Sequence, residues 1–143
     1  MLIRQFVPRD IMRIQEIENM SFDESYGIDM FRKLYEIGTG FLVAEVDGLV
    51  VGYIIFWIKY EGEGHIISIA VDKKYRNLKI GSQLLHQAIV ILSSCNIDRI
   101  TLEVRENNKE AIELYRKFDF KIDRIVPGYY SNNQGAILMY LDV

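Results

Sequence analysis

One stretch of the chain, GHIISIAVDKKYRNLKIGSQLL over Gly64–Leu85, constrains the fold more than any other. Its first part, His65–Val71, is apolar and rich in β-branched residues, which predicts a buried strand. The polar residues Asp72–Lys79 predict a turn, and a helical pattern begins at about Ile80–Gly81. A strand that runs through a short turn into a helix is typical of a layered arrangement of helices on a sheet.

The turn after this strand is suited to bind an anion. The first amides of a helix and its dipole favour a phosphate or diphosphate at that end. Arg76 adds a positive charge, Gly81 lets the backbone come close to a bulky anion, and Ser82 places a hydroxyl in the first helical turn. An ordinary strand–loop–helix crossover has the same features, so these residues by themselves leave both interpretations open.

The pattern V-D-x-x-Y-R-x-x-x-I-G-x-x-L-L in this stretch resembles the acetyl-CoA-binding segment of the GNAT superfamily of N-acetyltransferases. Arg76 and Gly81 match the first and last positions of that family's R/Q-x-x-G-x-G/A motif. Lys79 stands where the family usually has its first glycine, and it either clashes with the diphosphate or adds a charge to it. The resemblance implies that acetyl-CoA binds at this β–α turn. The residues implied here are Ile69, Ala70, Val71, Arg76, Asn77, Leu78, Lys79, Ile80, Gly81 and Ser82.

The length of 143 residues fits a single domain over residues 1–143, and half of the residues are hydrophobic, which is enough for a core. The single cysteine, Cys95, lies in an apolar helical run. We interpret it as a small core residue of a cytoplasmic protein, with a nucleophilic role as the alternative.

Several classes of partner are disfavoured by charge and composition. A net charge of −3 argues against nucleic acid and suits a peptide whose free end is positive. No apolar run approaches the roughly 18 residues of a membrane span, and no charged-then-apolar leader precedes the first element. Two histidines and one cysteine without metal-ligand spacing predict no metal. The sequence does not distinguish a monomer from a homodimer.

The remaining hydrophobic patterns predict an alternation of strands and helices. We expect Asp10 and Asp29 to cap the first two helices, and Asp47-Gly48 to form a tight hairpin turn. The expected strands are Leu2–Val7, Gly40–Val46, Leu49–Tyr60, His65–Val71, Asp98–Arg105, Phe120–Val126 and Ala136–Val143. The expected helices are 10–20, 29–38, 80–94 and 107–118, and the expected loops include Phe22–Gly27 and Pro127–Gly135.

This order, β-α-α-β-β-β-α-β-α-β-β, predicts the fold class. Consecutive strands in the first half imply antiparallel hairpins, and the central strand–helix–strand passage implies a parallel pair with a right-handed crossover. We therefore expect an α/β (α+β) fold with a mixed central β-sheet and helices on both faces. The GNAT fold has the same order of elements.

A second segment, ITLEVRENNKEAIELYRKFDF over Ile100–Phe120, resembles the signature L-x-L-E-V-R-x-x-N-x-x-A-I-x-L-Y-x-x-x-G-F of RimI-like GNAT enzymes. Those enzymes acetylate the α-amino group of protein N-termini. Asn108 and Tyr115 are seven residues apart, on one face of a helix. The resemblance implies that Asn108 binds a pantetheine amide and that Tyr115 protonates the departing thiolate. The alternative for Tyr115 is packing in the core. Asp119 replaces the signature's glycine, at a modest structural cost.

Alternation along the same strand places Glu103 on the face opposite Ile100, Leu102 and Val104. A carboxylate in an apolar strand is costly unless it is paired or used. The resemblance makes Glu103 the general base, whereas pairing with Arg105 or exposure to solvent are the structural alternatives.

His65 is a second candidate in the catalytic step. Its strand, GHIISIAV, resembles the corresponding strand of N-terminal acetyltransferases. If the two strands are parallel neighbours, His65 and Glu103 would relay a proton along a chain of waters. A structural histidine is the alternative.

The acceptor's chemistry favours N-termini. Deprotonating an α-amino group of pKa 7.7–8.0 at pH 7 costs only about 1–1.4 kcal/mol, whereas a lysine requires roughly 4.6 kcal/mol. The sequence has no serine–histidine pair or activated cysteine that would indicate a covalent enzyme intermediate, so we expect direct attack.

Two loops are candidates for binding the acceptor peptide. Tyr129 and Tyr130 resemble the tyrosine-bearing loop that holds peptide backbones in this group, with simple packing as the alternative. Phe22 and Tyr26 are expected to form a wall around the first side chain. Asn132–Gln134 stand where RimI-type loops often carry an acidic residue, so the preferred first residue stays open.

The sequence therefore predicts transfer of an acetyl group from acetyl-CoA to the N-termini of proteins or peptides, with ribosomal proteins as one open class of target. One alternative is acetylation of lysine or of a small amine. Another is an acyl-CoA-binding sensor without turnover, which Lys79 keeps open.

Overall fold

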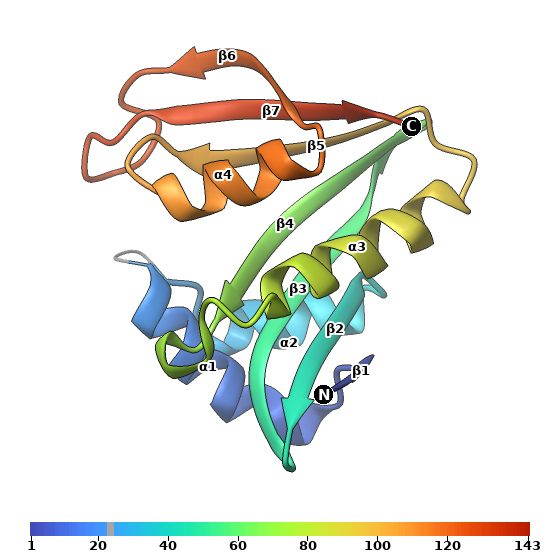
Figure 1. Ribbon diagram of the computed structural model, residues 1–143, viewed down its shortest axis with the longest axis vertical. Helices are drawn as coiled ribbons and strands as arrows, with labels where there is room; N and C mark the ends of the chain where they lie inside the picture. Colours follow the sequence, from blue (N-terminus) through green and yellow to red (C-terminus); the bar gives the residue numbers. More distant parts are fainter. Residues whose placement is uncertain (23–24) are drawn as a thin grey trace. The chain divides into compact units, whose positions relative to one another are not determined.

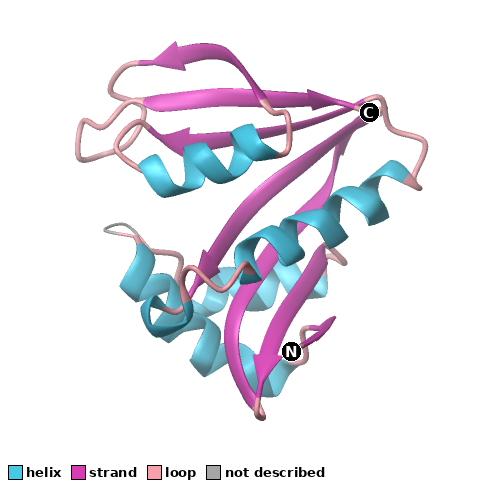
Figure 2. Cartoon of the chain, in the orientation of Figure 1, coloured by secondary structure: helices cyan, strands magenta, loops and turns pink. Residues whose placement is uncertain are grey.

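The computed structural model describes residues 1–22 and 25–143 (Figures 1 and 2). Within these residues, seven strands form one mixed sheet in the order β1-β2-β3-β4-β5-β7-β6. The strands are β1 Leu2–Gln5, β2 Gly40–Val46, β3 Leu49–Tyr60, β4 Glu63–Val71, β5 Arg99–Arg105, β6 Lys121–Val126 and β7 Ala136–Asp142. The helices are α1 Ile11–Ser21, α2 Ile28–Glu36, α3 Ile80–Ser93 and α4 Lys109–Lys117, and short 3₁₀ turns lie at Pro8–Asp10 and Lys73–Tyr75. The predicted mixed sheet and order of elements are confirmed.

The contacts within the chain define two compact units. The first unit comprises residues 1–57 and 68–90, and the second comprises residues 58–67 and 91–143. The first contains β1, β2, α1 and α2, and the second contains β5, α4, β6 and β7, whereas β3, β4 and α3 contribute residues to both.

In the first unit, β1 pairs with β2 and β2 with β3, both antiparallel. The β2–β3 hairpin closes with Val46 opposite Leu49, and the two residues between them, Asp47 and Gly48, have φ angles of 49° and 82°. Two consecutive positive φ angles are the requirement of a type I′ turn, which matches the twist of the strands. The tight turn predicted at Asp47-Gly48 is confirmed.

Helices cover both faces of the strands in this unit. A side chain added at Gly52 of β3 would lie 3.2 Å from Leu84 of α3. The next residue, Tyr53, points to the opposite face, because side chains alternate along a strand, and it contacts Glu18 of α1 and Phe31 of α2. Figure 1 shows α3 on one side of these strands and α1 and α2 on the other.

In the second unit, β4 pairs in parallel with β5, with His65 opposite Thr101. On its other side β5 pairs antiparallel with β7, and β7 with the edge strand β6. Ile100, Leu102 and Val104 of β5 are buried, whereas the residues Thr101, Glu103 and Arg105 between and after them are half-buried. The predicted division of this strand into an apolar face and a face that carries Glu103 is confirmed.

Two predicted helix caps are wrong. Asp10 does precede α1, but its carboxylate accepts hydrogen bonds from the guanidinium of Arg4 at 2.8 and 3.0 Å and from the amide of Val7 at 2.9 Å. Arg4 lies on β1. Because the carboxylate of Asp10 binds this arginine, it does not accept a hydrogen bond from the first amides of α1. The second helix begins after Gly27, and Asp29 is already its second residue.

The prediction of a buried Cys95 is also wrong. Helix α3 ends at Ser93, and Cys95 lies exposed in the turn that follows, where its thiol donates to the carbonyl of Ile91 at 3.3 Å. The buried face of the helix ends with Leu92, just before the helix itself ends. The apolar run in the sequence is therefore longer than the helix that it forms.

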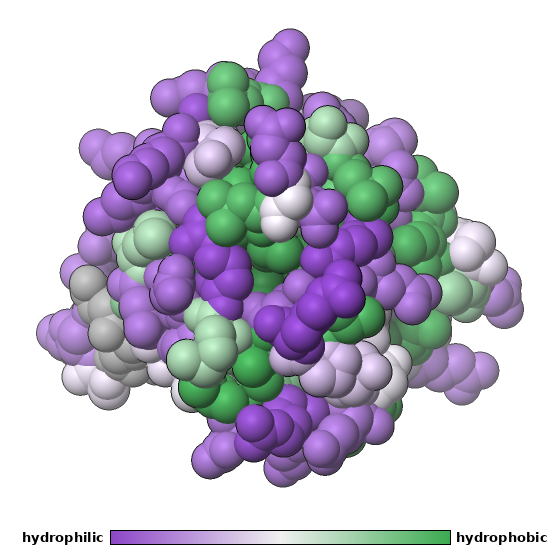
Figure 3. All heavy atoms as spheres, turned by 90° about the horizontal axis from the view of Figure 1, so that it is seen from below, coloured by the Kyte–Doolittle hydropathy of each residue, from purple (hydrophilic) through white to green (hydrophobic). Residues whose placement is uncertain are grey.

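The loop predicted over Phe22–Gly27 includes residues 23 and 24, which lie outside the described residues. No helix among residues 1–22 and 25–143 is long and apolar enough to cross a membrane. On the face drawn in Figure 3, apolar residues are interspersed with hydrophilic ones, a distribution that is ordinary for protein surfaces.

Gly40 provides a test of packing in the first unit. A Cβ at this position would clash with the ring of Phe56, its partner across the β2–β3 pair. Because the ring is buried and held on the sheet, we expect Gly40→Ala to lower the free energy of unfolding by about 1–3 kcal/mol, as measured by urea denaturation.

The same clash predicts that the two positions are coupled. Phe56→Leu replaces the ring with a smaller side chain, so the double variant should be more stable than the sum of the two single effects by about 1 kcal/mol. Strict additivity would show that the ring is not what Gly40 accommodates.

Candidate active site

The turn that follows β4 begins at Asp72, which is buried and bonded on both its carboxylate and its amide. Its carboxylate accepts from the amide of Lys74 at 2.9 Å and from the guanidinium of Arg13 on α1, and its own amide donates to the carbonyl of Val51 at 2.8 Å. Burial opposes ionisation, but the bonds from Lys74 and Arg13 hold the pKa of Asp72 below its usual value. A charged, buried aspartate thus fixes the start of the turn to two neighbouring elements.

Arg76 lies in extended backbone just after the 3₁₀ turn. Its Nε donates to the carbonyl of Val71 at 3.3 Å and its Nη2 to the hydroxyl of Ser21 at 3.4 Å. The guanidinium therefore lies near the end of β4, beside the end of α1. Sequence reasoning predicted a cation here but did not predict the contact with Ser21.

The start of α3 supplies further groups for an anion. The amide of Gln83 donates to the carbonyl of Lys79 at 3.1 Å, which is the first bond of the helical pattern. The amides of Ile80, Gly81 and Ser82 precede it and have no acceptor within the helix. With the positive end of the helix dipole, they have the chemistry that a diphosphate requires. All ten residues predicted for the cofactor turn, from Ile69 to Ser82, belong to the first unit.

Two residues of the turn have left-handed backbone conformations. Asn77 has a φ of 64° and Lys79 a φ of 62°. Asparagine tolerates this region, but lysine does not favour it. Lys79 therefore has the backbone conformation that suits the family's glycine, and its side chain is exposed. Asp119, which replaces the glycine of the second motif, also has a left-handed backbone conformation, with a φ of 69°.

In the second unit, the parallel pairing brings His65 and Glu103 into direct contact. His65 is buried, and its Nε2 lies 3.0 Å from Oε2 of Glu103, while its Nδ1 lies 2.7 Å from the hydroxyl of Thr101. Sequence reasoning expected a chain of waters between the two side chains and considered Arg105 as an alternative partner of Glu103. The observed partner is His65. Its Cα lies opposite that of Thr101, and its side chain extends along the strand to Glu103, the next residue on the same face of β5.

The contact with Glu103 fixes the direction of one hydrogen bond of His65. An ionised carboxylate only accepts, so Nε2–H of His65 donates to Glu103. The hydroxyl of Thr101, which contacts Nδ1, also donates to the carboxylate of Glu63 at 3.2 Å. The hydrogen bond from His65 is the main cause that lowers the pKa of Glu103, against the opposing effect of burial. Glu103 is therefore a carboxylate at neutral pH, half-buried and held by the imidazole of His65.

Tyr115 of α4 is buried, with its ring 5.7 Å from that of Phe120. Burial raises the pKa of Tyr115, and the neighbouring Tyr130 raises it further. The phenol therefore keeps its proton at neutral pH. Asn108 is the N-cap of the same helix, and its carboxamide oxygen accepts from the amide of Ala111 at 3.2 Å.

The loop between β6 and β7 is held by contacts that the sequence did not reveal. The guanidinium of Arg105 lies 3.9 Å from the ring centre of Tyr130 and donates to the side chain of Asn132 at 3.2 Å. Tyr129 packs edge-on against Tyr130 at 5.0 Å and is itself half exposed. The two tyrosines thus differ, since Tyr130 is fixed by a cation on β5 whereas Tyr129 faces solvent.

Phe22 and Tyr26 lie in the first unit, after α1. Phe22 is the C-cap of this helix, and its amide donates to the carbonyl of Glu18 at 3.1 Å. The ring of Tyr26 packs edge-on against that of Phe31 at 5.9 Å. Both side chains are half-buried, so each presents part of its surface to solvent.

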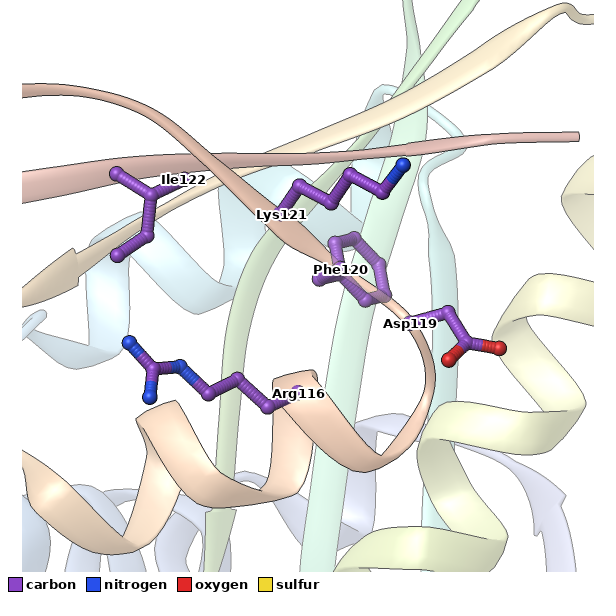
Figure 4. Close-up of a pocket in the computed structure, with 5 residues that line it drawn as sticks. All are labelled: Arg116, Asp119, Phe120, Lys121 and Ile122. Carbon is purple, nitrogen blue, oxygen red and sulfur yellow. The ribbon is translucent and has the colours of Figure 1, made fainter.

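A shallow depression where α4 leads into β6 contains none of the predicted site residues. Figure 4 shows two of the residues that line it, Arg116 on α4 and Lys121 on β6. Its lining residues are Arg116, Asp119, Phe120, Lys121 and Ile122.

Within residues 1–22 and 25–143, no three histidine, cysteine, aspartate or glutamate side chains cluster as a metal site requires.

The chain is similar to known proteins in both sequence and fold. Residues 11–120 match the model of the acetyltransferase (GNAT) family. The chain is 37% identical to an uncharacterized N-acetyltransferase of Methanocaldococcus jannaschii, over 97% of this chain and 90% of that protein. It is 36% identical to the N-alpha-acetyltransferase of Sulfurisphaera tokodaii, over 91% and 86%. The crystal structure of Ard1 from Thermoplasma volcanium superimposes with a TM-score of 0.95 at 34% identity, covering 99% of this chain and 97% of that one.

The left-handed backbone at Lys79 predicts that glycine is more stable there. We expect Lys79→Gly to raise the free energy of unfolding by about 0.5–1 kcal/mol in urea denaturation, because it removes the steric cost of a Cβ at positive φ. Lys79→Ala keeps the Cβ and is the matched control, with an expected change within about 0.5 kcal/mol. An equal gain in both variants would attribute the effect to the lysine side chain instead.

The bond between His65 and Glu103 predicts a pH-dependent contribution to stability. Because the pKa of Glu103 is lower in the folded than in the unfolded chain, the contribution is present above the unfolded value and is lost as the pH falls through the folded value. Glu103→Gln should therefore be less stable than the wild type at about pH 7, and the difference should narrow at about pH 3. A constant difference in urea denaturation at both pH values would contradict this linkage.

Proposed function

This chain belongs to the acetyltransferase (GNAT) family, and from that premise we propose that it transfers the acetyl group of acetyl-CoA to the N-terminal α-amino group of proteins. The 36% identity to the N-alpha-acetyltransferase of Sulfurisphaera tokodaii supports this class of acceptor. The observation that carries the chemistry is the hydrogen bond from His65 to Glu103, which holds a carboxylate ionised and oriented.

The donor's diphosphate is assigned to the turn between Arg76 and Ser82. The guanidinium of Arg76 and the amides of Ile80, Gly81 and Ser82 match the charge and the donor pattern of that group. Acetyl-CoA supplies an acetyl group activated as a thioester. The left-handed backbone at Lys79 keeps the helix start in the conformation that a glycine would give.

Glu103 is assigned the role of general base. An α-amino group at pH 7 needs only about 1–1.4 kcal/mol to lose its proton, so one carboxylate, acting directly or through a water, is sufficient. His65 positions that carboxylate from its buried side through Nε2. The α-ammonium group first releases one proton to solvent. The neutral nitrogen then bonds to the acetyl carbon while the carbon–sulfur bond breaks, and the second proton that the nitrogen must lose passes to Glu103.

Tyr115 is assigned the role of general acid. Its phenol carries a proton at neutral pH, and a thiolate leaving group requires one proton. Transfer of this proton to sulfur balances the proton that Glu103 receives. Tyr129 and Tyr130 are assigned to the peptide backbone, and Phe22 and Tyr26 to the first side chain of the acceptor.

Peptides that carry both a free N-terminus and one internal lysine test the acceptor class. After incubation with acetyl-CoA, we expect mass spectrometry to locate the acetyl group on the first residue, because the α-amine is far easier to deprotonate than lysine. Acetylation of lysine alone would replace the proposed acceptor. Binding of acetyl-CoA without any transfer would indicate a sensor.

Two substitutions test the assigned roles. Tyr115→Phe and Glu103→Gln should each lower kcat by about 10²-fold or more, whereas the Kd for acetyl-CoA, measured by calorimetry, should change little. Tyr60→Phe and Glu113→Gln remove the same chemical groups at exposed positions and are the matched controls. Normal turnover in both active-site variants would refute the assignment.

A further inference from the structure

The buried carboxylate of Glu18 has no part in the chemistry assigned above. It lies on α1 and is only 2% exposed. Burial raises its pKa, and the donors around it, which oppose that effect, are neutral. A buried acid without a cation is costly, and an apolar side chain of similar size often stabilises a protein at least as well. A contribution to the stability of the fold therefore does not explain why a carboxylate is buried at this position.

The two oxygens of Glu18 bind different parts of the first unit. One accepts the hydroxyl of Tyr53 on β3, which also lies 3.2 Å from the hydroxyl of Ser68 on β4. The other accepts the backbone amide of Tyr26 at 2.8 Å. The carboxylate thus connects the sheet to the segment between α1 and α2.

The carbonyl of Tyr26 is held from the same helix. Gln15 lies one turn before Glu18, and its side-chain amide donates to the carbonyl of Tyr26 at 2.8 Å. Residues three apart share one face of a helix, so α1 binds both polar backbone groups of Tyr26 from one side. The ring of Tyr26 packs on Phe31, and Phe31 packs on Tyr53 at 5.9 Å.

We propose that Glu18 is a positioning residue that fixes Tyr26 and thereby sets which first side chain of the acceptor the enzyme prefers. This inference rests on the proposed function, because it takes Tyr26 as part of the wall around that side chain. The position of Tyr26 sets the space that is left for the first side chain of the acceptor. A difference of one methylene group in an apolar pocket changes kcat/KM by about 10–200-fold, so a small shift of Tyr26 changes which first residue is preferred.

Amide exchange tests the positioning without any substrate. In Glu18→Ala the amide of Tyr26 loses its acceptor, so its hydrogen exchange, followed by NMR, should accelerate by about tenfold or more. In Glu18→Gln the new carboxamide oxygen still accepts this amide, while its NH₂ donates to the oxygen of Tyr53, whose hydroxyl turns to Ser68. We expect the amide of Tyr26 to exchange at near the wild-type rate in Glu18→Gln, and the amides within α2 to exchange at unchanged rates in both variants.

Peptide selectivity tests the consequence. Across peptides that differ only in the first residue, Glu18→Ala should change the ratio of kcat/KM between large and small first residues by about tenfold, mainly through KM for the peptide. The KM for acetyl-CoA should stay within about twofold, and Glu18→Gln should restore the wild-type order of preference.

Tyr53→Phe is the matched control for a general loss of stability. It removes a buried hydrogen bond from the same carboxylate but leaves the bond to Tyr26 in place. We expect lower stability in urea with unchanged exchange at Tyr26 and unchanged peptide preference.

The inference is overturned if the amide of Tyr26 exchanges no faster in Glu18→Ala, or if the peptide preference stays constant while exchange accelerates. It is also overturned if Tyr53→Phe shifts the preference as far as Glu18→Ala does. A wild-type protein that acetylates no N-terminal peptide would instead refute the proposed function, and this inference with it. The outcomes therefore separate the two failures.

Discussion

The parallel pairing of β4 with β5 is the constraint on which the candidate chemistry depends. Its register sets His65 opposite Thr101, so that one imidazole bonds both Thr101 and Glu103 on the same face of the sheet. A slip of one residue would turn every side chain of β5 to the other face and move Glu103 away from the imidazole. Parallel strands need a long crossover, and α3 provides it between β4 and β5.

The buried acids of the first unit show how differently a protein satisfies such groups. Asp10 is bonded by Arg4 and Asp72 by Arg13, and in both the bonds outweigh burial and lower the pKa. Among the described residues, the donors to Glu18 are neutral, and burial raises its pKa. The two aspartates therefore anchor elements of the fold as ion pairs. Glu18 instead accepts a hydrogen bond from the backbone amide of Tyr26, which is a neutral donor.

Departures from a sequence motif do not always change the backbone. Lys79 and Asp119 replace glycines of the two motifs that this chain resembles, and their φ angles are 62° and 69°. The surrounding turns therefore impose the left-handed conformation on residues that have a Cβ, which is less favourable for lysine than for aspartate. The helix start at Ile80 is preserved, and what Lys79 changes is the charge and bulk beside it.

The sequence by itself determined the order of elements, the Asp47-Gly48 turn and the two faces of β5, because periodicity and turn chemistry are local properties. Only the tertiary structure decided that Glu103 binds His65 and not Arg105, that Cys95 is exposed, and that Glu18 holds the backbone amide of Tyr26, eight residues along the chain. These contacts depend on strand register and on where helices end against the sheet. Both are fixed by packing between segments far apart in the chain, which no local pattern encodes.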